Sequence, residues 1–506
     1  MSAVTDTPVL GAPWVQEYPG ATTGIVVGPM RPEWASRLGR ARAVLWCATA
    51  EDLAGLPAGF SSSAIQRVPL DDSGAARIVE VLPRFVRLDA RHLPSLYFSP
   101  GATAEAQRGG ESLVAWLVGE LRELHRARVT RQQDAFRWQQ HVLANLADYA
   151  RRPLPESWRG ALAGLPAAVC GAGPSLDVSA ARLADGQEGC VVFAADSALR
   201  TLARHGVRVD FAVSVDVAKT PEKCLPESGE MPARVVLAAV SPPEWRRRVA
   251  PERVHFVSSR QITTDWLARD GVVPPALAVA ENCGVTALEL ARWLGCSPIY
   301  LFGLDLALSG RQRHTTAADA TIYARSGFDA AQEFPEVPGN WEPSVPTHAP
   351  GDWRALNARL ATFPAGAVFN VNDRGARLEN ACAVRPGEWV APAAADKASR
   401  LAAFEGAGVA AQAAAWSDFT AELRRCGERL SGKLPELRAS LATHGPDAVA
   451  VALRPWLADA AIGRALGGYA LKLMPHLLPP TEGEVEFWRG LLEELEQLAG
   501  ALAALR

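Results

Sequence analysis

The stretch AAVCGAGPSLD, residues 167–177, decides the fold of this 506-residue chain. Its first four residues are apolar and predict a short buried strand, and Pro174 is suited to the first position of a helix that follows. Between them, Gly171 and Gly173 permit positive φ and close approach of the backbone. Backbone N–H groups at the start of the helix would face an anion, and Ser175 adds a hydroxyl donor. The stretch therefore predicts a strand, a phosphate-binding loop and a helix.

This glycine loop departs from the two best-known phosphate motifs. Leu176 stands where the dinucleotide fingerprint G-x-G-x-x-G has its third glycine. No lysine follows at the spacing of a Walker loop. Taken alone, the stretch is as consistent with a tight turn between strand and helix as with a phosphate site.

Apolar runs alternate with helical segments well beyond this loop. The runs lack strict polar alternation, which is typical of strands covered on both faces. The alternation predicts a mostly parallel sheet with right-handed crossovers, and therefore a Rossmann-like α/β domain. The six runs are residues 167–170, 191–195, 211–215, 235–240, 254–257 and 299–302.

Polar residues stand at the predicted carboxyl ends of these strands. In open α/β sheets, ligands bind outside those ends. A single Asp after a strand is usually a cap or turn residue, but three of them on one edge, beside a phosphate-type loop, favour a site. The residues are Asp196 and Ser197 after the second run, Asp216 after the third, and Gly303 and Asp305 after the sixth.

Two further segments supply candidate contacts to a ligand. Asn282 precedes a helix and could present donors to a nucleotide together with Gly284 and Thr286, although a plain helix cap is equally consistent. The basic loop 311–314 ends in His314. Beside a phosphate site, this loop could neutralise a leaving phosphate or transfer a proton, while a surface histidine is the alternative.

The chain is too long for one hydrophobic core, so more than one domain is expected. The C-terminal part is rich in alanine and leucine and predicts helices that either close their own core or also dock a protein partner. The predicted parts are a small α/β domain (1–108), a helical connector (109–160), the Rossmann-like domain (161–385) and a C-terminal helical bundle (386–506).

Composition narrows the classes of function. The net charge of −3 gives no global basic field, so we expect no binding to nucleic acid. No uncharged apolar run reaches about 18 residues, which argues against a membrane span, and residues 1–11 lack the pattern of a signal peptide. The 8 cysteines are scattered without a CxxC pair, which suits buried thiols in a reducing cytoplasm better than a zinc site. We therefore expect a cytoplasmic protein.

Five blocks of the sequence resemble, in this order, the family that includes bacterial motility accessory factors and archaeal MptE-like pterin diphosphokinases. The resemblance covers about residues 165–382. The blocks are GAGPSLD (171–177), FAADSAL (193–199), DFAVSVD (210–216), ENCGVTALELARWLGCSPIYLFGLDLALSG (281–310) and FNVNDRGARLENA (369–381).

The resemblance implies a glycosyltransferase that moves a nonulosonic acid from a CMP-activated donor to Ser or Thr of flagellin, or to another protein acceptor. No cofactor would be required, because the CMP-sugar is a substrate. Asp216 would sit beside the reacting carbon, and Asp305 and His314 are further catalytic candidates. The nucleotide would be bound by Gly171, Gly173, Pro174, Ser175, Leu176, Asp196, Ser197, Asn282, Gly284, Thr286 and Gly303.

Two alternatives stay open. A diphosphokinase would transfer diphosphate from ATP to 6-hydroxymethylpterin and would want Mg²⁺, so that Asp216 and Asp305 would become metal ligands. A binding protein could have kept the nucleotide pocket and lost catalysis, because no complete catalytic constellation is visible in the sequence.

Overall fold

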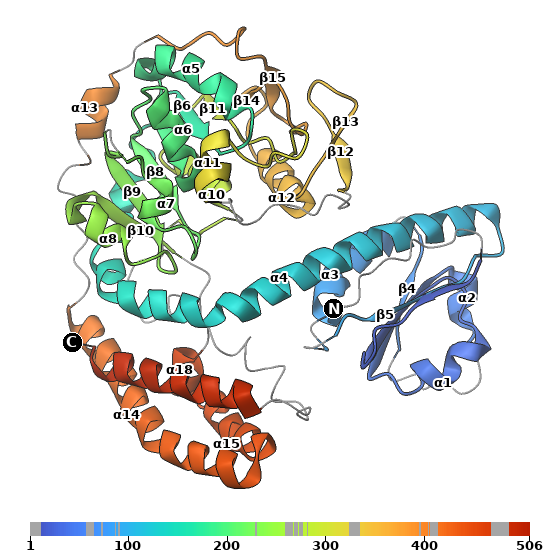
Figure 1. The fold of residues 1–506 in the computed structure, drawn as a ribbon. Helices are drawn as coiled ribbons and strands as arrows, with labels where there is room; N and C mark the ends of the chain where they lie inside the picture. Colours follow the sequence, from blue (N-terminus) through green and yellow to red (C-terminus); the bar gives the residue numbers. More distant parts are fainter. Residues whose placement is uncertain are drawn as a thin grey trace. The chain divides into compact units, whose positions relative to one another are not determined.

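The chain forms two compact units, one within residues 12–133 and one from residue 134 onward. Figure 1 shows the elements of both, coloured along the sequence. The long helix α4 (Ala104–Arg151) contributes its first part to one unit and its last part to the other. The computed structural model describes residues 12–56, 65–71, 74–86, 88–89, 92–227, 230–258, 267, 272, 277–280, 282–322, 334–393, 396–402, 404, 413–466 and 485–505.

The first unit is a small α/β fold, as the sequence predicts. Its strands follow the order β1-β5-β2-β3-β4, in which β1 is antiparallel to β5 and the other pairs are parallel. Leu117 and Leu121 of α4 share a buried cluster with Ile25 and Leu45, so α4 covers one face of this sheet. The elements are β1 (Trp14–Gln16), β2 (Thr23–Val27), β3 (Ala43–Ala48), β4 (Ile65–Pro69), β5 (Ser95–Phe98), α1 (Ala35–Leu38), α2 (Ala50–Ala54) and α3 (Gly74–Val86).

The second unit is built on an eight-stranded sheet in which every strand pair is parallel. The mostly parallel sheet predicted from the apolar runs is therefore confirmed. Two short strands near its far edge, β14 and β15, were not among those runs. The strands are β6 (Ala167–Cys170), β7 (Val191–Ala195), β8 (Phe211–Ser214), β9 (Arg234–Ala238), β10 (Val254–Val257), β11 (Ile299–Phe302), β14 (Val368–Val371) and β15 (Cys382–Val384).

The strand order of this sheet reverses between β6 and β11. The order is β10-β9-β8-β7-β6-β11-β14-β15, so the chain first adds strands on one side of β6 and then returns to add them on the other. Ligands of doubly wound sheets bind at the carboxyl ends of the strands beside such a reversal. The glycine loop (171–175) follows β6 and lies at this position. We call the carboxyl ends of β6, β7, β8 and β11 the switch-point edge.

Helices connect the strands and cover the sheet. Helix α10 packs across β6, β7 and β8, and α5 packs against β11. A two-stranded hairpin, β12 (Glu336–Pro338) with β13 (Ser344–Pro346), follows α11. The helices are α5 (Leu176–Gly186), α6 (Leu199–Arg204), α7 (Pro221–Cys224), α8 (Trp245–Arg248), α10 (Cys283–Trp293), α11 (Thr316–Thr321), α12 (Pro350–Leu360) and α13 (Lys397–Ala402).

The C-terminal residues form helices that pack on one another, as predicted. Helices α14 (Ala413–His444) and α18 (Val485–Ala503) run side by side, with α15 (Pro446–Ala458) and α16 (Ala460–Ala465) against α14. Their facing leucines are buried at helical spacing and close a common core. These are Leu423, Leu430, Leu434 and Leu437 of α14, and Leu491, Leu495, Leu498 and Leu502 of α18.

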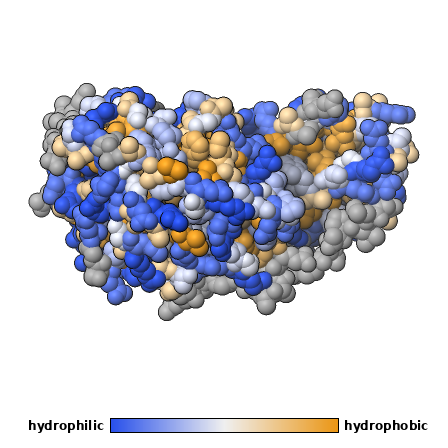
Figure 2. Space-filling model, turned by 90° about the horizontal axis from the view of Figure 1, so that it is seen from above, coloured by the Kyte–Doolittle hydropathy of each residue, from blue (hydrophilic) through white to orange (hydrophobic). Residues whose placement is uncertain are grey.

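The outer face of the molecule is mixed in polarity. On the side seen in Figure 2, hydrophobic side chains lie in several separate areas between hydrophilic ones. Among the helices that the structure describes, none combines the length and the apolar character needed to cross a membrane.

Two glycines of α14 allow a test of the helical core. A Cβ on buried Gly427 would lie 2.7 Å from the carbonyl oxygen of Ala499, whereas a Cβ on exposed Gly432 meets nothing within 4 Å. We expect Gly427→Ala to destabilise the protein by about 1–3 kcal/mol, because α18 must move away. Gly432→Ala should be neutral or stabilising by up to about 1 kcal/mol, because alanine favours helix. Denaturant unfolding of both variants measures this. Equal stability would show that α14 and α18 are not in close contact.

Candidate functional site

The glycine loop and the end of β11 approach each other closely. Gly171 N–H donates to Phe302 O at 2.8 Å, and Gly173 N–H donates to Gly303 O at 2.7 Å. A Cβ on either loop glycine would lie within 2.7 Å of the Gly303 carbonyl oxygen. These two glycines are therefore needed for close approach. The positive φ that we expected in the loop lies instead on its partner Gly303, at +62°.

The donors of the glycine loop are bound by a carboxylate of the protein itself. Ser175 N–H donates to Asp305 Oδ2 at 2.7 Å, and the Ser175 hydroxyl donates to Asp305 Oδ1. Asp305 is only 2% exposed, and burial raises the pKa of its carboxyl to about 6. Helix α5 begins at Leu176, so the first helical residue is Leu176 and not Pro174 as predicted. In this structure the anion at the start of α5 is Asp305.

Contacts with a later segment of the chain also fix the backbone of Asp305. The carbonyl oxygen of Asp305 accepts from Ala376 N–H at 2.8 Å. Gly375 packs against the Cα of Asp305, and a Cβ added to Gly375 would lie 3.1 Å from that atom. The β12–β13 hairpin in turn binds this segment, since Arg377 N–H donates to Pro338 O at 2.7 Å. The position of the carboxylate is therefore set by two further parts of the chain.

Asp196, at the end of β7, is saturated with hydrogen bonds. Its Oδ1 accepts from Ser197 N–H at 2.6 Å and from the Ser197 hydroxyl at 2.9 Å. Its Oδ2 accepts from the Ser214 hydroxyl at 2.8 Å and from Cys283 Sγ at 3.3 Å. The residue is 1% exposed. A carboxylate with four donors organises the ends of β7 and β8.

Asp216 follows β8 in a different environment. Its Oδ1 accepts from Ala218 N–H at 2.8 Å. Burial raises the pKa of its carboxyl; the charge of Lys219 opposes the shift, and that of Asp196 adds to it. A carboxylate with a raised pKa at a strand end is suited to accept a proton.

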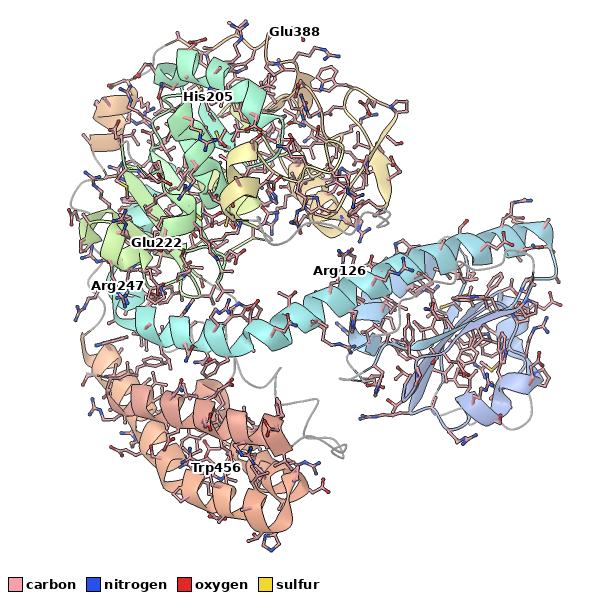
Figure 3. All side chains as sticks on the ribbon, viewed as in Figure 1. Arg126, His205, Glu222, Arg247, Glu388 and Trp456 are labelled. Carbon is pink, nitrogen blue, oxygen red and sulfur yellow. The ribbon has the colours of Figure 1, made fainter. Side chains whose placement is uncertain are left out.

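Lys219 is a site residue that the sequence reasoning missed. It is only 7% exposed, and its Nζ donates to the Ser197 hydroxyl at 2.7 Å. The indole of buried Trp245 donates to its carbonyl oxygen at 2.8 Å. Helix α7 begins at Pro221, two residues after Lys219, and Figure 3 labels Glu222 on this helix. The one available signal was its place three residues after Asp216 in the turn that follows a strand.

The residues predicted around Asn282 form the start of a helix. The Asn282 side chain accepts from Val285 N–H at 3.0 Å and donates to Asp352 Oδ2 at 2.8 Å. The Thr286 hydroxyl donates to Asn282 O at 2.8 Å. A Cβ on Gly284 would lie 2.6 Å from a methyl of Leu304. The hydrogen bonds of Asn282 and Thr286 are those of a cap for α10, one of the two interpretations left open.

The structure brings His314 to the same edge. The next residue, Thr315, donates its N–H to Ala172 O of the glycine loop at 2.8 Å. His314 Nδ1 lies 3.7 Å from Asp319 Oδ1, and its ring centroid lies 5.9 Å from that of His348. Burial lowers the pKa of His314; the hydrogen bond with Asp319 opposes this shift, and the nearby charge of Lys219 adds to it. His314 is therefore neutral near pH 7.

Most of the predicted site residues thus gather at the switch-point edge, but in different roles. Asp305 and Ser175 bind each other, Asp196 and Ser197 bind each other, and Asp216 lies near Lys219. Within the described ranges, no group of three His, Cys, Asp or Glu side chains is placed to hold a metal ion.

The region that carries this edge matches a known family. A family model described as 6-hydroxymethylpterin diphosphokinase MptE-like matches residues 140–311. A solved structure of the Maf glycosyltransferase from Magnetospirillum magneticum AMB-1 is similar in fold, with a TM-score of 0.56 at 15% sequence identity, covering 96% of this chain and 78% of that chain.

At this identity the structural similarity shows a shared fold. Comparison with curated protein sequences gave no match. The resemblance seen in the sequence blocks is confirmed by the family match and by the fold. The match to the family model ends at Arg311, so it includes the glycine loop, Asp216 and Lys219 but not His314.

The pKa of Asp305 gives the site a testable pH dependence. Because its folded-state value of about 6 exceeds the usual 3.8, the folded protein binds this proton more tightly than the unfolded chain. The contribution of Asp305 to stability is therefore fully present below about pH 4 and is lost as the pH rises through about 6. The total loss in the free energy of unfolding is at most about 3 kcal/mol.

Asp305→Asn should lack this loss, because an amide keeps an acceptor for Ser175 N–H and does not titrate. The free energy of unfolding of both proteins between pH 4 and pH 7 measures the difference. Parallel curves would show that Asp305 titrates normally in the folded protein.

Proposed function

We propose that the protein is a glycosyltransferase that uses a nucleotide-activated sugar. By the resemblance of its sequence blocks, the donor is a CMP-activated nonulosonic acid and the acceptor is a Ser or Thr of flagellin or of another protein. The observation that carries the proposal is the pair Asp216 and Lys219 at the end of β8, a carboxylate with a raised pKa beside a buried cation. Transfer from a phosphate leaving group requires a base and a cation of this kind.

Each group then has a part in the reaction. The acceptor hydroxyl oxygen forms a bond to the anomeric carbon and gives its proton to Asp216. The bond from that carbon to the phosphate oxygen breaks, and its electron pair leaves with the nucleoside monophosphate. His314, neutral near pH 7, is a candidate to hydrogen-bond the departing phosphate.

The fold adds support outside the central region. The similarity to the Maf glycosyltransferase spans 96% of this chain, including the regions that flank the MptE-like part. A transferase that acts on a protein needs contacts beyond the donor pocket, and the C-terminal helices are candidates for them. All eight cysteines are free thiols, which fits action in the reducing cytoplasm.

A second candidate is supported by the description of the matching family. A diphosphokinase would transfer diphosphate from ATP to 6-hydroxymethylpterin with Mg²⁺. Asp216 and Asp305 would then be its metal ligands, and Asp305 would first have to release Ser175. Because that release breaks two buried hydrogen bonds, the geometry favours the glycosyltransferase.

Ligand-induced stabilisation separates the two functions and also a protein that only binds. CMP without metal should raise the unfolding midpoint under the glycosyltransferase proposal, by an amount that grows with the logarithm of concentration. Stabilisation by ATP only when Mg²⁺ is present would contradict it and support the diphosphokinase. If the protein binds CMP but neither hydrolyses a CMP-sugar nor transfers its sugar, the result would support a binding protein without catalysis.

Asp216→Asn tests the catalytic part of the proposal. It keeps the shape of the side chain and removes the proton acceptor, so we expect the transfer rate to fall by about 10²-fold or more while CMP still binds. The wild-type rate should fall with decreasing pH through a pKa above the usual Asp range, since the base must be unprotonated.

The transfer rate of Asp216→Asn should not show this fall with decreasing pH. Asp185→Asn, on the exposed side of α5, is the matched control and should behave as wild type. An unchanged rate for Asp216→Asn would show that another group is the base.

A further inference from the structure

The carboxyl end of β8, two residues before Asp216, is fixed by a hydroxyl from another segment of the chain. This hydroxyl belongs to Ser241, which lies after β9 and is completely buried. Its Oγ accepts from Ala238 N–H at 2.9 Å and donates to Ser214 O at 2.7 Å. The side chain of Ser241 therefore ties the last residues of β8 and β9 together.

The register of the sheet explains why a hydroxyl lies at this place. Arg234 N–H donates to Asp210 O at 3.0 Å, where β9 and β8 begin to pair. The hydrogen bonds of a parallel ladder are evenly spaced, so the same series brings Ala238 N–H opposite Ser214 O, four residues further along each strand. The Ser241 hydroxyl binds this donor and this acceptor. It therefore joins the two strands at the point where their ladder ends.

The peptide group that follows Ser214 is held on both sides. Its carbonyl oxygen accepts from Ser241, and its N–H, which belongs to Val215, donates to Cys283 Sγ at 3.4 Å. Strand β8 ends at Ser214, so these side chains take over from the ladder in directing the backbone. The next residue but one is Asp216, whose position depends on that direction.

The segment that carries Ser241 also holds the far end of the turn that contains Asp216. The indole of Trp245 donates to Lys219 O at 2.8 Å. Trp245 is completely buried, like Ser241. The turn is thus bound at its start through Ser214 and at its end through Lys219, and Asp216 lies between these two points.

Helix α4 in turn fixes the backbone around Ser241. Asn145 is completely buried, and its Nδ2 donates to Ala239 O at 2.9 Å and to Ser241 O at 2.8 Å. His141 Nδ1 lies 2.9 Å from Val240 O and donates to it, because a carbonyl oxygen only accepts. Three successive carbonyl oxygens after β9 therefore bind α4. Buried carbonyl groups need such partners, so this segment cannot shift without a cost in free energy.

We propose that Ser241 is a positioning residue for sugar transfer, which fixes Asp216 through Ser214, and that Asn145 keeps Ser241 in place. This proposal rests on the proposed function, in which Asp216 accepts the proton of the acceptor hydroxyl. A proton acceptor must lie within hydrogen-bonding distance of the group that it deprotonates, so a small shift of its carboxylate lowers the rate. Without the Ser241 hydroxyl, Ser214 O loses its donor and the peptide that leads to Asp216 can turn.

Replacement of Ser241 tests the proposal in the full-length protein. We expect Ser241→Ala to lower kcat about ten- to hundredfold and to change KM for the CMP-sugar by less than about twofold. Ser241→Cys keeps the size of the side chain but hydrogen-bonds weakly, so its kcat should lie between those of Ser241→Ala and wild type. An unchanged kcat in Ser241→Ala would overturn the proposal.

Ser95→Ala is the matched control. Ser95 lies in β5 of the first unit and is 7% exposed, and its hydroxyl also accepts from a backbone N–H, that of Tyr18 at 3.2 Å. The control therefore removes a buried hydroxyl far along the chain from Asp216. Its kcat and KM should equal those of wild type.

A double-mutant cycle separates positioning from a general loss of structure. In the Asp216→Asn background, Ser241→Ala should lower kcat by less than about twofold further, because the group that Ser241 positions has lost its function. If the effects of the two substitutions multiply, Ser241 does not act through Asp216 and the proposal is wrong.

Amide hydrogen exchange tests the geometry without any transfer activity. Exchange within residues 211–218, measured by mass spectrometry, should be faster in Ser241→Ala than in wild type and unchanged in Ser95→Ala. Equal exchange in Ser241→Ala and wild type would overturn the proposal. If wild type transfers no sugar while exchange rises in Ser241→Ala, the proposed function is wrong and the hold of Ser241 on the end of β8 stands.

Discussion

The hydrogen bonds between Asp305 and Ser175 are the interaction on which the site depends. They join residues 130 positions apart, one after β11 and one after β6, across the reversal of strand order. Because Gly171 and Gly173 have no side chains, the two strand ends can approach within hydrogen-bonding distance of each other. A buried N–H without a partner is costly, and Asp305 removes that cost without an external ligand. The glycine loop is therefore held in its conformation by the protein itself.

Three carboxylates on one edge of the sheet have three different environments. Asp305 is a buried cap on the glycine loop, Asp196 is saturated by four donors, and Asp216 has its pKa raised with a lysine nearby. The same residue type thus shapes the loop and organises neighbouring strand ends, and we propose that at Asp216 it accepts a proton. Environment rather than identity assigns such roles.

The features that sequence patterns predicted correctly are those that depend on residues close together in the chain. Apolar runs between helical segments gave the parallel sheet, and the polar residues after them gave its edge. The partner of Ser175 depends on a contact over 130 residues, which no local pattern contains. Strand β14 was missed because it is four residues long with Asn370 inside it, and β15 because it has only three residues. Lys219 was missed because its burial depends on how the turn after β8 folds back toward β7.

The structure of a complex with CMP tests the central claim most directly, since it places the phosphate relative to the glycine loop and to Asp216. The account predicts that the phosphate binds at the switch-point edge beside Asp216, while Asp305 still accepts both hydrogen bonds from Ser175. A phosphate bound to the N–H of Ser175, with the Asp305 carboxylate displaced from the glycine loop, would contradict it.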